Sequence, residues 1–236
     1  VSFKADCFKK VRCKDFFLKN FEYNYNKVGV GNLKGNVFTI TIRNSRFGVE
    51  EFVNELKEKN MMLPNFFGPQ RFGSYKNTHL IGLHLLKREY EEAGEELCKG
   101  SGFYEEKFCK SLLGGVVKAF KSLGSKILTF YVHSLQSYLF NKALSNMIIS
   151  GEYEKKLFLP GYGSAPSPLV EDEMALLGIS TKDFVNKELN VKVKGCGRKT
   201  FMRINDLRVI TQKPLVLKFR LDKGCFASIV LNELCK

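Results

Sequence analysis

Hydrophobic and polar residues alternate one by one in short segments near both ends of the chain. Between residues 37 and 43, three large apolar residues share one face and two Thr share the other, which is the period of a half-buried strand. The same alternation returns over residues 215–221, where Leu and Phe alternate with Val, Lys and Arg. Strands are also predicted over three shorter segments: 191–194, 200–204 and 207–210.

The middle of the chain follows the 3.6-residue period of helices instead. Apolar residues recur at helical spacing in five segments, which predict helices over residues 50–59, 79–97, 103–122, 127–149 and 226–235. Strands, then helices, then strands again indicate an α+β fold, in which a mixed or antiparallel sheet domain is interrupted by a mostly helical insertion.

Residues 64–73 form the most informative segment, with the sequence Pro-Asn-Phe-Phe-Gly-Pro-Gln-Arg-Phe-Gly. Its Pro and Gly residues disfavour a helix interior or a central strand, so the segment is expected to be a loop. Three Phe rings beside an Asn, a Gln and an Arg could stack against an extruded nucleobase and bind its edge. A Phe-rich loop could equally pin a sheet to a helix, and this segment alone leaves both interpretations open.

The net charge of the 236-residue chain is +14, and it is unevenly distributed. Residues 1–46 hold ten Lys or Arg against three acids, and residues 182–223 hold twelve against four, whereas residues 50–106 hold eleven acids against seven bases. If the fold brings the two basic segments together, they form one positive surface suited to a polyanion such as RNA. Ordinary solvation by Lys is the alternative.

The positions of the Cys, His and apolar residues argue against a metal-binding, a membrane-spanning or a secreted protein. The seven Cys form no Cys-x-x-Cys pair and no zinc spacing with the three His, so free thiols and no metal site are expected. Structural roles are expected for His79, His84 and His133. No apolar run approaches the length of a membrane span, and the chain shows no signal peptide. These patterns predict an intracellular protein of a reducing compartment, with nucleus and cytoplasm both open.

Six blocks in a fixed order resemble the TruD family of RNA pseudouridine synthases. Among them, the loop Asn65–Gly73 is similar to the family's signature loop, and Tyr131–Asn141 is similar to a helix of its insertion domain. The full set is Gly31–Asn44, Asn65–Gly73, Tyr131–Asn141, Leu159–Gly163, Gly195–Lys199 and Leu217–Leu234. Several ordered blocks are far more specific than any one motif.

This resemblance implies the isomerisation of uridine to pseudouridine in tRNA or another structured RNA. Family members use an essential Asp, with no cofactor and no metal. The resemblance also implies a division of the chain into three parts: 1–90 as the first part of the catalytic domain, 91–200 as the insertion domain, and 201–236 as the returning strand and helix.

The resemblance also assigns expected roles to particular side chains. Phe67 matches the aromatic residue that holds the flipped base, and Asn65 the residue that hydrogen-bonds near the catalytic carboxylate. Phe226 falls at the position of a second active-site aromatic residue, although it could equally be a core residue that anchors the last helix. Gln70 and Arg71 are expected mainly to brace the loop, with RNA contact as their second possible role.

The catalytic Asp of the family is the element that this chain lacks. It belongs to a Gly-x-Lys-Asp type motif, which these residues do not contain, and Asp6 and Asp15 stand in a different context. We therefore expect an N-terminally truncated fragment that is inactive alone. Two other interpretations remain: a catalytically dead RNA-binding module of the same fold, and a protein-interaction scaffold whose helical insertion is the working part.

Overall fold

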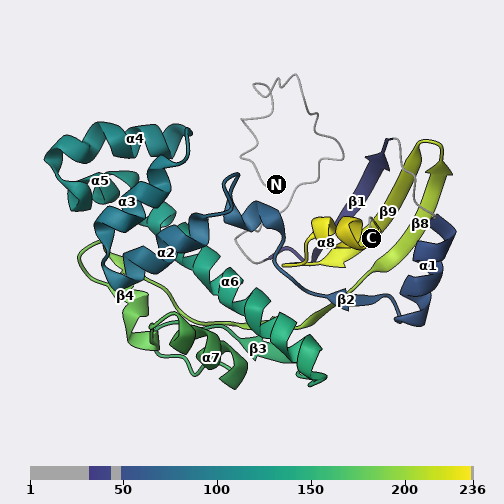
Figure 1. The fold of residues 1–236 in the computed structure, drawn as a ribbon. Helices are drawn as coiled ribbons and strands as arrows, with labels where there is room; N and C mark the ends of the chain where they lie inside the picture. Colours follow the sequence, from purple (N-terminus) through teal and green to yellow (C-terminus); the bar gives the residue numbers. More distant parts are fainter. Residues whose placement is uncertain (1–31, 44–48, 235–236) are drawn as a thin grey trace, which may run out of the picture.

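The structure is a computed structural model that describes residues 32–43 and 49–234. Figure 1 shows a sheet with its helices at one end of the molecule and a larger group of helices at the other. The predicted α+β class is confirmed, because long helices and antiparallel sheets both occur. Residues 1–31, which hold Asp6, Asp15 and most of the first basic segment, lie outside the described residues.

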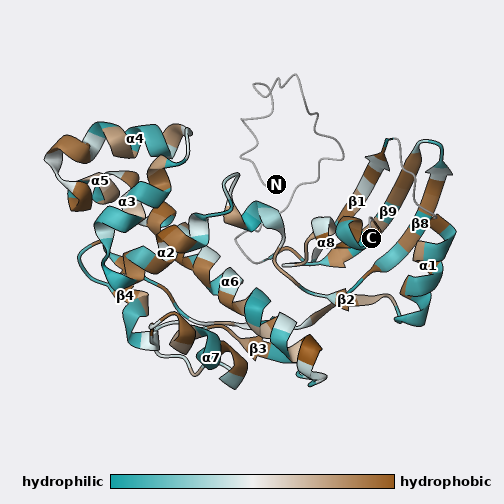
Figure 2. Ribbon diagram, in the orientation of Figure 1, coloured by the Kyte–Doolittle hydropathy of each residue, from teal (hydrophilic) through white to brown (hydrophobic). Residues whose placement is uncertain are grey.

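The sheet region consists of three antiparallel strands in the order β1 (Gly35–Ile42), β9 (Leu215–Asp222) and β8 (Asn205–Gln212). Phe38 of β1 pairs with Phe219 of β9, and their ring centroids lie 5.6 Å apart. Hydrophobic and hydrophilic positions are mixed along these strands, as Figure 2 shows. The strand predictions at 37–43, 207–210 and 215–221 are confirmed.

Two helices cover the apolar face of this sheet: α1 (Val49–Glu58) and α8 (Ala227–Leu234). Every second residue of β9 is buried, and these side chains form one core with Phe52 and Leu56 of α1 and Val230 of α8. The helices predicted at 50–59 and 226–235 are therefore confirmed, with the end of the second one outside the described residues.

The other region consists of the 26-residue helix α6 and five further helices. Together these helices are α2 (Thr78–Lys87), α3 (Tyr90–Cys98), α4 (Phe103–Ser111), α5 (Val116–Leu123), α6 (Ser125–Ser150) and α7 (Pro168–Leu176). Buried residues occur along most of α6, from Leu128 to Met147, because neighbouring helices cover it on several sides. The helix predicted at 127–149 is confirmed.

Two of the predicted helices are wrong in their continuity. The segment 79–97 divides into α2 and α3, because Arg88 adopts a left-handed conformation with φ of 64° and its N–H binds the carbonyl of His84. The segment 103–122 divides into α4 and α5, with a short 3-10 helix (Leu112–Gly114) between them and Gly115 at φ of 93°. Apolar spacing continues across both breaks, so periodicity alone joined the pieces.

Three pairs of short strands lie outside the main sheet in the part of the chain that the structure describes. β2 (Met62–Pro64) pairs with β7 (Phe201–Arg203), and β3 (Lys156–Phe158) pairs with β6 (Gly197–Lys199). β4 (Val185–Asn186) pairs with β5 (Val191–Lys192), which is shorter than the strand predicted at 191–194, and Lys194 instead forms an isolated bridge with Tyr162. The strand predicted at 200–204 corresponds to β7.

The apolar side chains form two separate clusters, one beneath the sheet and one among the helices. The helical cluster includes Ile81 and Leu86, which precede residue 91, so the domain boundaries 1–90, 91–200 and 201–236 stay a prediction. Within the part of the chain that the structure describes, no helix has both the length and the apolar character that crossing a membrane requires.

Candidate functional site

The loop between β2 and α2 lies where the two regions meet. It begins beside β7, because the Asn65 N–H donates to the carbonyl of Thr200 at 2.7 Å, and it ends in a 3-10 helix at Pro69–Phe72. Asn141 of α6 binds the backbone at the centre of the loop. The side-chain Oδ1 of Asn141 accepts from the Phe67 N–H at 2.8 Å, and its Nδ2 donates to the Phe67 carbonyl at 3.0 Å. The loop is therefore fixed to α6 through the backbone of Phe67.

The Phe67 ring belongs to an aromatic cluster built from three elements. Its centroid lies 5.5 Å from that of Phe140 on α6, in an edge-on arrangement, and 5.7 Å from that of Phe226 at the start of α8. Phe140 is fully buried, whereas Phe67 and Phe226 are half-buried. The structure thus brings together the two aromatic residues that the sequence singled out.

Arg198, which immediately precedes Lys199 at the end of β6, stacks on the Phe67 ring. Its Cζ lies 3.8 Å from the ring centroid, within the range of a cation–π contact. Its guanidinium donates to the carbonyl of Asn65 through Nε at 3.2 Å and Nη2 at 2.9 Å, and to the carbonyl of Gly224 through Nη1 at 2.8 Å. Burial lowers the pKa of Arg198 to about 10, so the guanidinium keeps its charge at neutral pH.

Asn65 is only 4% exposed, and both ends of its side chain are engaged. Oδ1 accepts from Nη2 of Arg198 at 2.8 Å, and Nδ2 donates to the carbonyl of Lys199 at 3.0 Å. Asn65 therefore positions the guanidinium of Arg198. The expected hydrogen bond from Asn65 toward a catalytic carboxylate stays a prediction.

Gln70 and Arg71 each contact a neighbouring helix, and their expected role in bracing the loop stays a prediction. The exposed Gln70 accepts from the Ser228 hydroxyl at 3.2 Å, which joins the loop to α8. Arg71 donates through Nε to the Ser137 hydroxyl at 3.1 Å, and its Cζ lies 5.4 Å from the Phe130 ring centroid. Burial lowers the pKa of the Arg71 guanidinium.

An open cavity of about 1030 Å³ lies beside this cluster, and Asn65, Phe67 and Arg71 line it. Six Lys or Arg side chains also line it against one acid, Asp222, so the cavity is strongly positive. The basic residues are Lys34, Arg71, Arg198, Lys199, Arg203 and Lys223. Lys34 comes from the first basic segment of the sequence and four others come from the second, and the pairing of β1 with β9 brings these segments together; Arg71 comes from the loop. This arrangement suits a phosphate backbone and an extruded base.

The sequence analysis did not identify two residues that contact Phe67, Arg198 and Asn141. Arg198 lies inside the resembling block Gly195–Lys199, and Asn141 ends the block Tyr131–Asn141, so both were within matched segments. Nothing in the local pattern shows that an Arg 131 residues further along the chain stacks on Phe67. The sequence feature that could have identified Arg198 is its place between Gly197 and Lys199 in a block that resembles the family.

The carboxylate that lines the cavity is exposed. Asp222 lies at the end of β9, and its Oδ1 is 3.8 Å from Nη1 of Arg220. A buried, hydrogen-bonded carboxylate poised at the Phe67 ring is absent from the cavity lining among residues 32–43 and 49–234. The described residues also contain no group of three or more His, Cys, Asp or Glu side chains that could hold a metal ion.

The described histidines and cysteines occupy several kinds of position: His133, Cys196 and Cys225 line the cavity beside Phe67, and the buried Nδ1 of His79 has no hydrogen-bond partner among the described residues. His79 stacks on Tyr138 with centroids 4.5 Å apart, and burial lowers its pKa. His84 contacts Glu89 and His133 contacts Gln136, each at 2.7 Å. The four described cysteines, Cys98, Cys109, Cys196 and Cys225, are free thiols.

Comparison with known proteins gives one consistent result. The family model described as tRNA pseudouridine synthase D (TruD) matches residues 2–111 and 96–158. A relative from Saccharolobus solfataricus is 27% identical over 271 residues, which cover 99% of this chain and 71% of the relative. A relative from Sulfurisphaera tokodaii is 31% identical over 245 residues, covering 87% of this chain and 65% of the relative. Both relatives bear the name tRNA pseudouridine synthase D.

A solved structure shows that the fold is shared. The crystal structure of a Methanosarcina mazei protein titled tRNA pseudouridine synthase D superposes with a TM-score of 0.70 at 22% identity, over 98% of this chain and 76% of that one. The family model covers more than half of the present chain, and its description names an isomerase. The chain therefore belongs to the TruD family of pseudouridine synthases.

Proposed function

We propose that this chain forms the base-binding and RNA-binding part of a pseudouridine synthase that acts on tRNA. The observation that carries this proposal is the layer of Arg198 on Phe67, which opens onto a cavity lined by six basic side chains. The extruded uracil stacks on this layer. Asn65 positions the guanidinium, and Phe226 supports the Phe67 ring from the side.

The energetics of base extrusion support this placement. Removing a base from its stack costs a few kcal/mol, and base–aromatic stacking returns about 1 to 3 kcal/mol. A guanidinium plane backed by a Phe ring offers a flat, charged surface for a base. The surrounding Lys and Arg side chains bind the adjacent phosphates, so RNA affinity should fall steeply as salt is added.

The isomerisation detaches uracil from C1′ of its ribose and rejoins it through C5. An Asp carboxylate can divide this difficult step into two by attacking the sugar or the base. We propose that Asp222 does not fill this role, because it is exposed and lies beside Arg220. Asp6 and Asp15 do not belong to a Gly-x-Lys-Asp motif, so we expect residues 1–236 alone to bind RNA without turning it over. Because the proposed substrate is tRNA, the site of action is inside the cell.

Turnover of a uridine-containing tRNA transcript tests the proposal, with tritium release from C5 of uracil as the signal. We expect none from residues 1–236 alone, and turnover once an upstream segment with a Gly-x-Lys-Asp motif is joined to the chain. Phe67→Ala should abolish that turnover and weaken RNA binding by about 1 to 3 kcal/mol.

Three outcomes would contradict parts of this proposal. Turnover by the unextended chain that disappears in Asp222→Asn would make Asp222 the catalytic group. Unchanged RNA binding and turnover in Phe67→Ala would show that uracil lies elsewhere. Tight, salt-sensitive RNA binding with no turnover even in the extended chain would favour an RNA-binding module without catalytic activity.

A further inference from the structure

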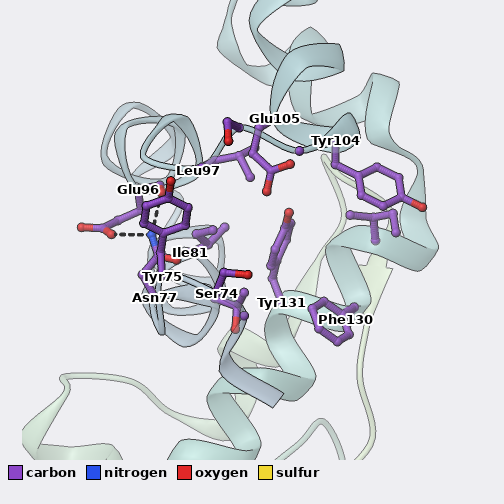
Figure 3. Close-up of a pocket in the computed structure, with 16 residues that line it drawn as sticks. Ser74, Tyr75, Asn77, Ile81, Glu96, Leu97, Tyr104, Glu105, Phe130 and Tyr131 are labelled. Carbon is purple, nitrogen blue, oxygen red and sulfur yellow. Dashed lines mark hydrogen bonds between the residues drawn. The ribbon is translucent and has the colours of Figure 1, made fainter. Parts of the chain in front are cut away.

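A second cavity of about 670 Å³ lies in the helical region, on the other side of the loop's C-terminal end. Gly73, Ser74 and Tyr75, which directly follow the 3-10 helix of the loop, form one wall, and residues of α3, α4 and the start of α6 form the others. Figure 3 shows Glu105 of α4 and Tyr131 of α6 pointing toward each other across this space. Its volume is in the range of sites that bind nucleotides and other small ligands.

Two polar groups of this cavity have no hydrogen-bond partner within the described ranges 32–43 and 49–234. Tyr131 is 4% exposed, and no described residue binds its hydroxyl. The carboxylate of Glu105 likewise lacks a partner there. It bends back over Gly100 and Gly102, where an added Cβ would lie 2.7 to 3.0 Å from its side-chain atoms. The two glycines thus make room for the carboxylate to face the cavity.

The other acid in the lining is already neutralised. Glu96 accepts from Nζ of Lys99 at 2.5 Å and from Nδ2 of Asn77 at 3.1 Å, and Figure 3 shows it directed away from Glu105. One carboxylate therefore remains for a ligand. The Tyr131 hydroxyl and the Glu105 carboxylate both face the open cavity, so a ligand there can form hydrogen bonds with both.

The second cavity shares a wall with the Phe67 site. Phe130 lines it, and the guanidinium of Arg71, which lines the first cavity, lies over the Phe130 ring at 5.4 Å. The contact between Arg71 and Phe130 is therefore one layer of side chains that separates the two cavities. The chain's net charge of +14 attracts a polyanion such as RNA and repels free organic cations.

We propose that this second cavity binds a guanine base of the RNA, close to the uridine held at Phe67. The inference rests on the proposed function. A carboxylate repels phosphate, so the group that it accepts must be a base edge that donates hydrogens. Guanine presents N1–H and its 2-amino group side by side, which matches the two oxygens of one carboxylate. Tyr75, 58% exposed at the cavity, supplies a ring for stacking.

Guanosine and inosine monophosphates provide the direct test, because inosine lacks only the 2-amino group. Both share the ribose and phosphate, so general attraction to a basic protein cancels between them. In calorimetric titration of the full chain, we expect guanosine monophosphate to bind about fivefold tighter or more. Glu105→Gln should remove this difference, whereas Glu92→Gln, an exposed acid of α3 outside this lining, should retain it. Tyr131→Phe keeps the ring and should weaken guanosine monophosphate binding.

Several results would overturn this inference. These are equal affinity for the two nucleotides, a preference that survives Glu105→Gln, and Glu105-dependent binding of spermidine in place of guanosine monophosphate, which would indicate a cation site. Turnover by the extended chain and its loss in Phe67→Ala would still hold in each case, so the proposed function is tested separately.

RNA substrates test the link between the two cavities. Replacing guanines near the target uridine with inosine should weaken RNA binding by about fivefold in the unmodified chain and have no effect in Glu105→Gln. If inosine substitution has no effect on RNA binding while guanosine monophosphate is still preferred, the pocket does not bind a neighbour of the target.

Discussion

Aromatic and polar side chains line both cavities, but the first holds six basic side chains and the second holds two acids and no Lys or Arg. Beside Phe67, the polar groups of Asn65 and Arg198 bind each other and the backbone, so they build a rigid surface. In the second cavity, Glu105 and Tyr131 face an open space without partners among the described residues. Polar groups that bind one another hold a surface rigid, whereas polar groups that lack partners can select a ligand with matching hydrogen-bonding groups. Mutations should therefore affect stability at the first cavity and selectivity at the second.

The largest effect is expected from Arg198→Met. The change removes three guanidinium contacts to the Asn65 carbonyl and amide and one to the Gly224 carbonyl. Leaving these acceptors without donors should lower the free energy of unfolding by about 3 kcal/mol, measured by urea denaturation. RNA affinity should fall as well.

Arg203→Met is the matched control, because Arg203 is exposed and lines the same cavity. We expect its free energy of unfolding to stay within about 0.5 kcal/mol of the parent chain. Equal destabilisation by both substitutions would show that the Arg198 network does not hold the platform together.

Asn141→Ala should have the next largest effect. The amide makes a reciprocal pair of hydrogen bonds with the Phe67 backbone, so its loss frees one donor and one acceptor of a half-buried loop. We expect a loss of about 2 kcal/mol in the free energy of unfolding, together with faster hydrogen exchange at the Phe67 amide. Lys142→Ala, at the exposed neighbouring position, serves as the control. An Asn141→Ala variant with an unchanged free energy of unfolding and an unchanged exchange rate at the Phe67 amide would show that Asn141 does not fix the loop.

Periodicity predicted the elements well where each element is local. The strands of the sheet and the helix α6 follow from alternation and from helical spacing. The breaks at Arg88 and Gly115 were missed, since one residue with positive φ interrupts a helix without changing the apolar pattern. Local rules cannot detect a break that tertiary packing selects.

The candidate site was predictable only in part, for a related reason. The loop, Phe67 and Phe226 were recognised because they carry a family resemblance, and the structure brings the two rings together. Arg198 and Asn141 both contact Phe67, which lies 131 and 74 positions away from them in the sequence. Glu105 and Tyr131 lie on two different helices, and only the folded chain shows that they share a cavity. The hydrophobic pattern of the sequence therefore does not show which distant residues pack together.

Arg203→Met should also change the salt dependence of RNA binding. If the exposed guanidinium binds an RNA phosphate, the slope of log affinity against log salt should become shallower by about one. Lys187→Met, an exposed base that lines neither cavity, should leave the slope unchanged. Filter binding at several salt concentrations measures both. Identical slopes for the two variants would mean that the positive cavity is not the path of the RNA backbone.

The smallest effect is expected from the contact between Gln70 and Ser228. This hydrogen bond joins the loop to α8, but Gln70 is exposed, so water can replace the partner that is lost. Gln70→Ala should cost only about 0.5 kcal/mol of unfolding free energy, and Ser228→Ala a similar amount. Because both substitutions break the same bond, the double variant should cost less than the sum of the two. Strictly additive losses would show that Gln70 braces the loop through other contacts, and that the platform beside Phe67 depends on Arg198 and Asn141 rather than on α8.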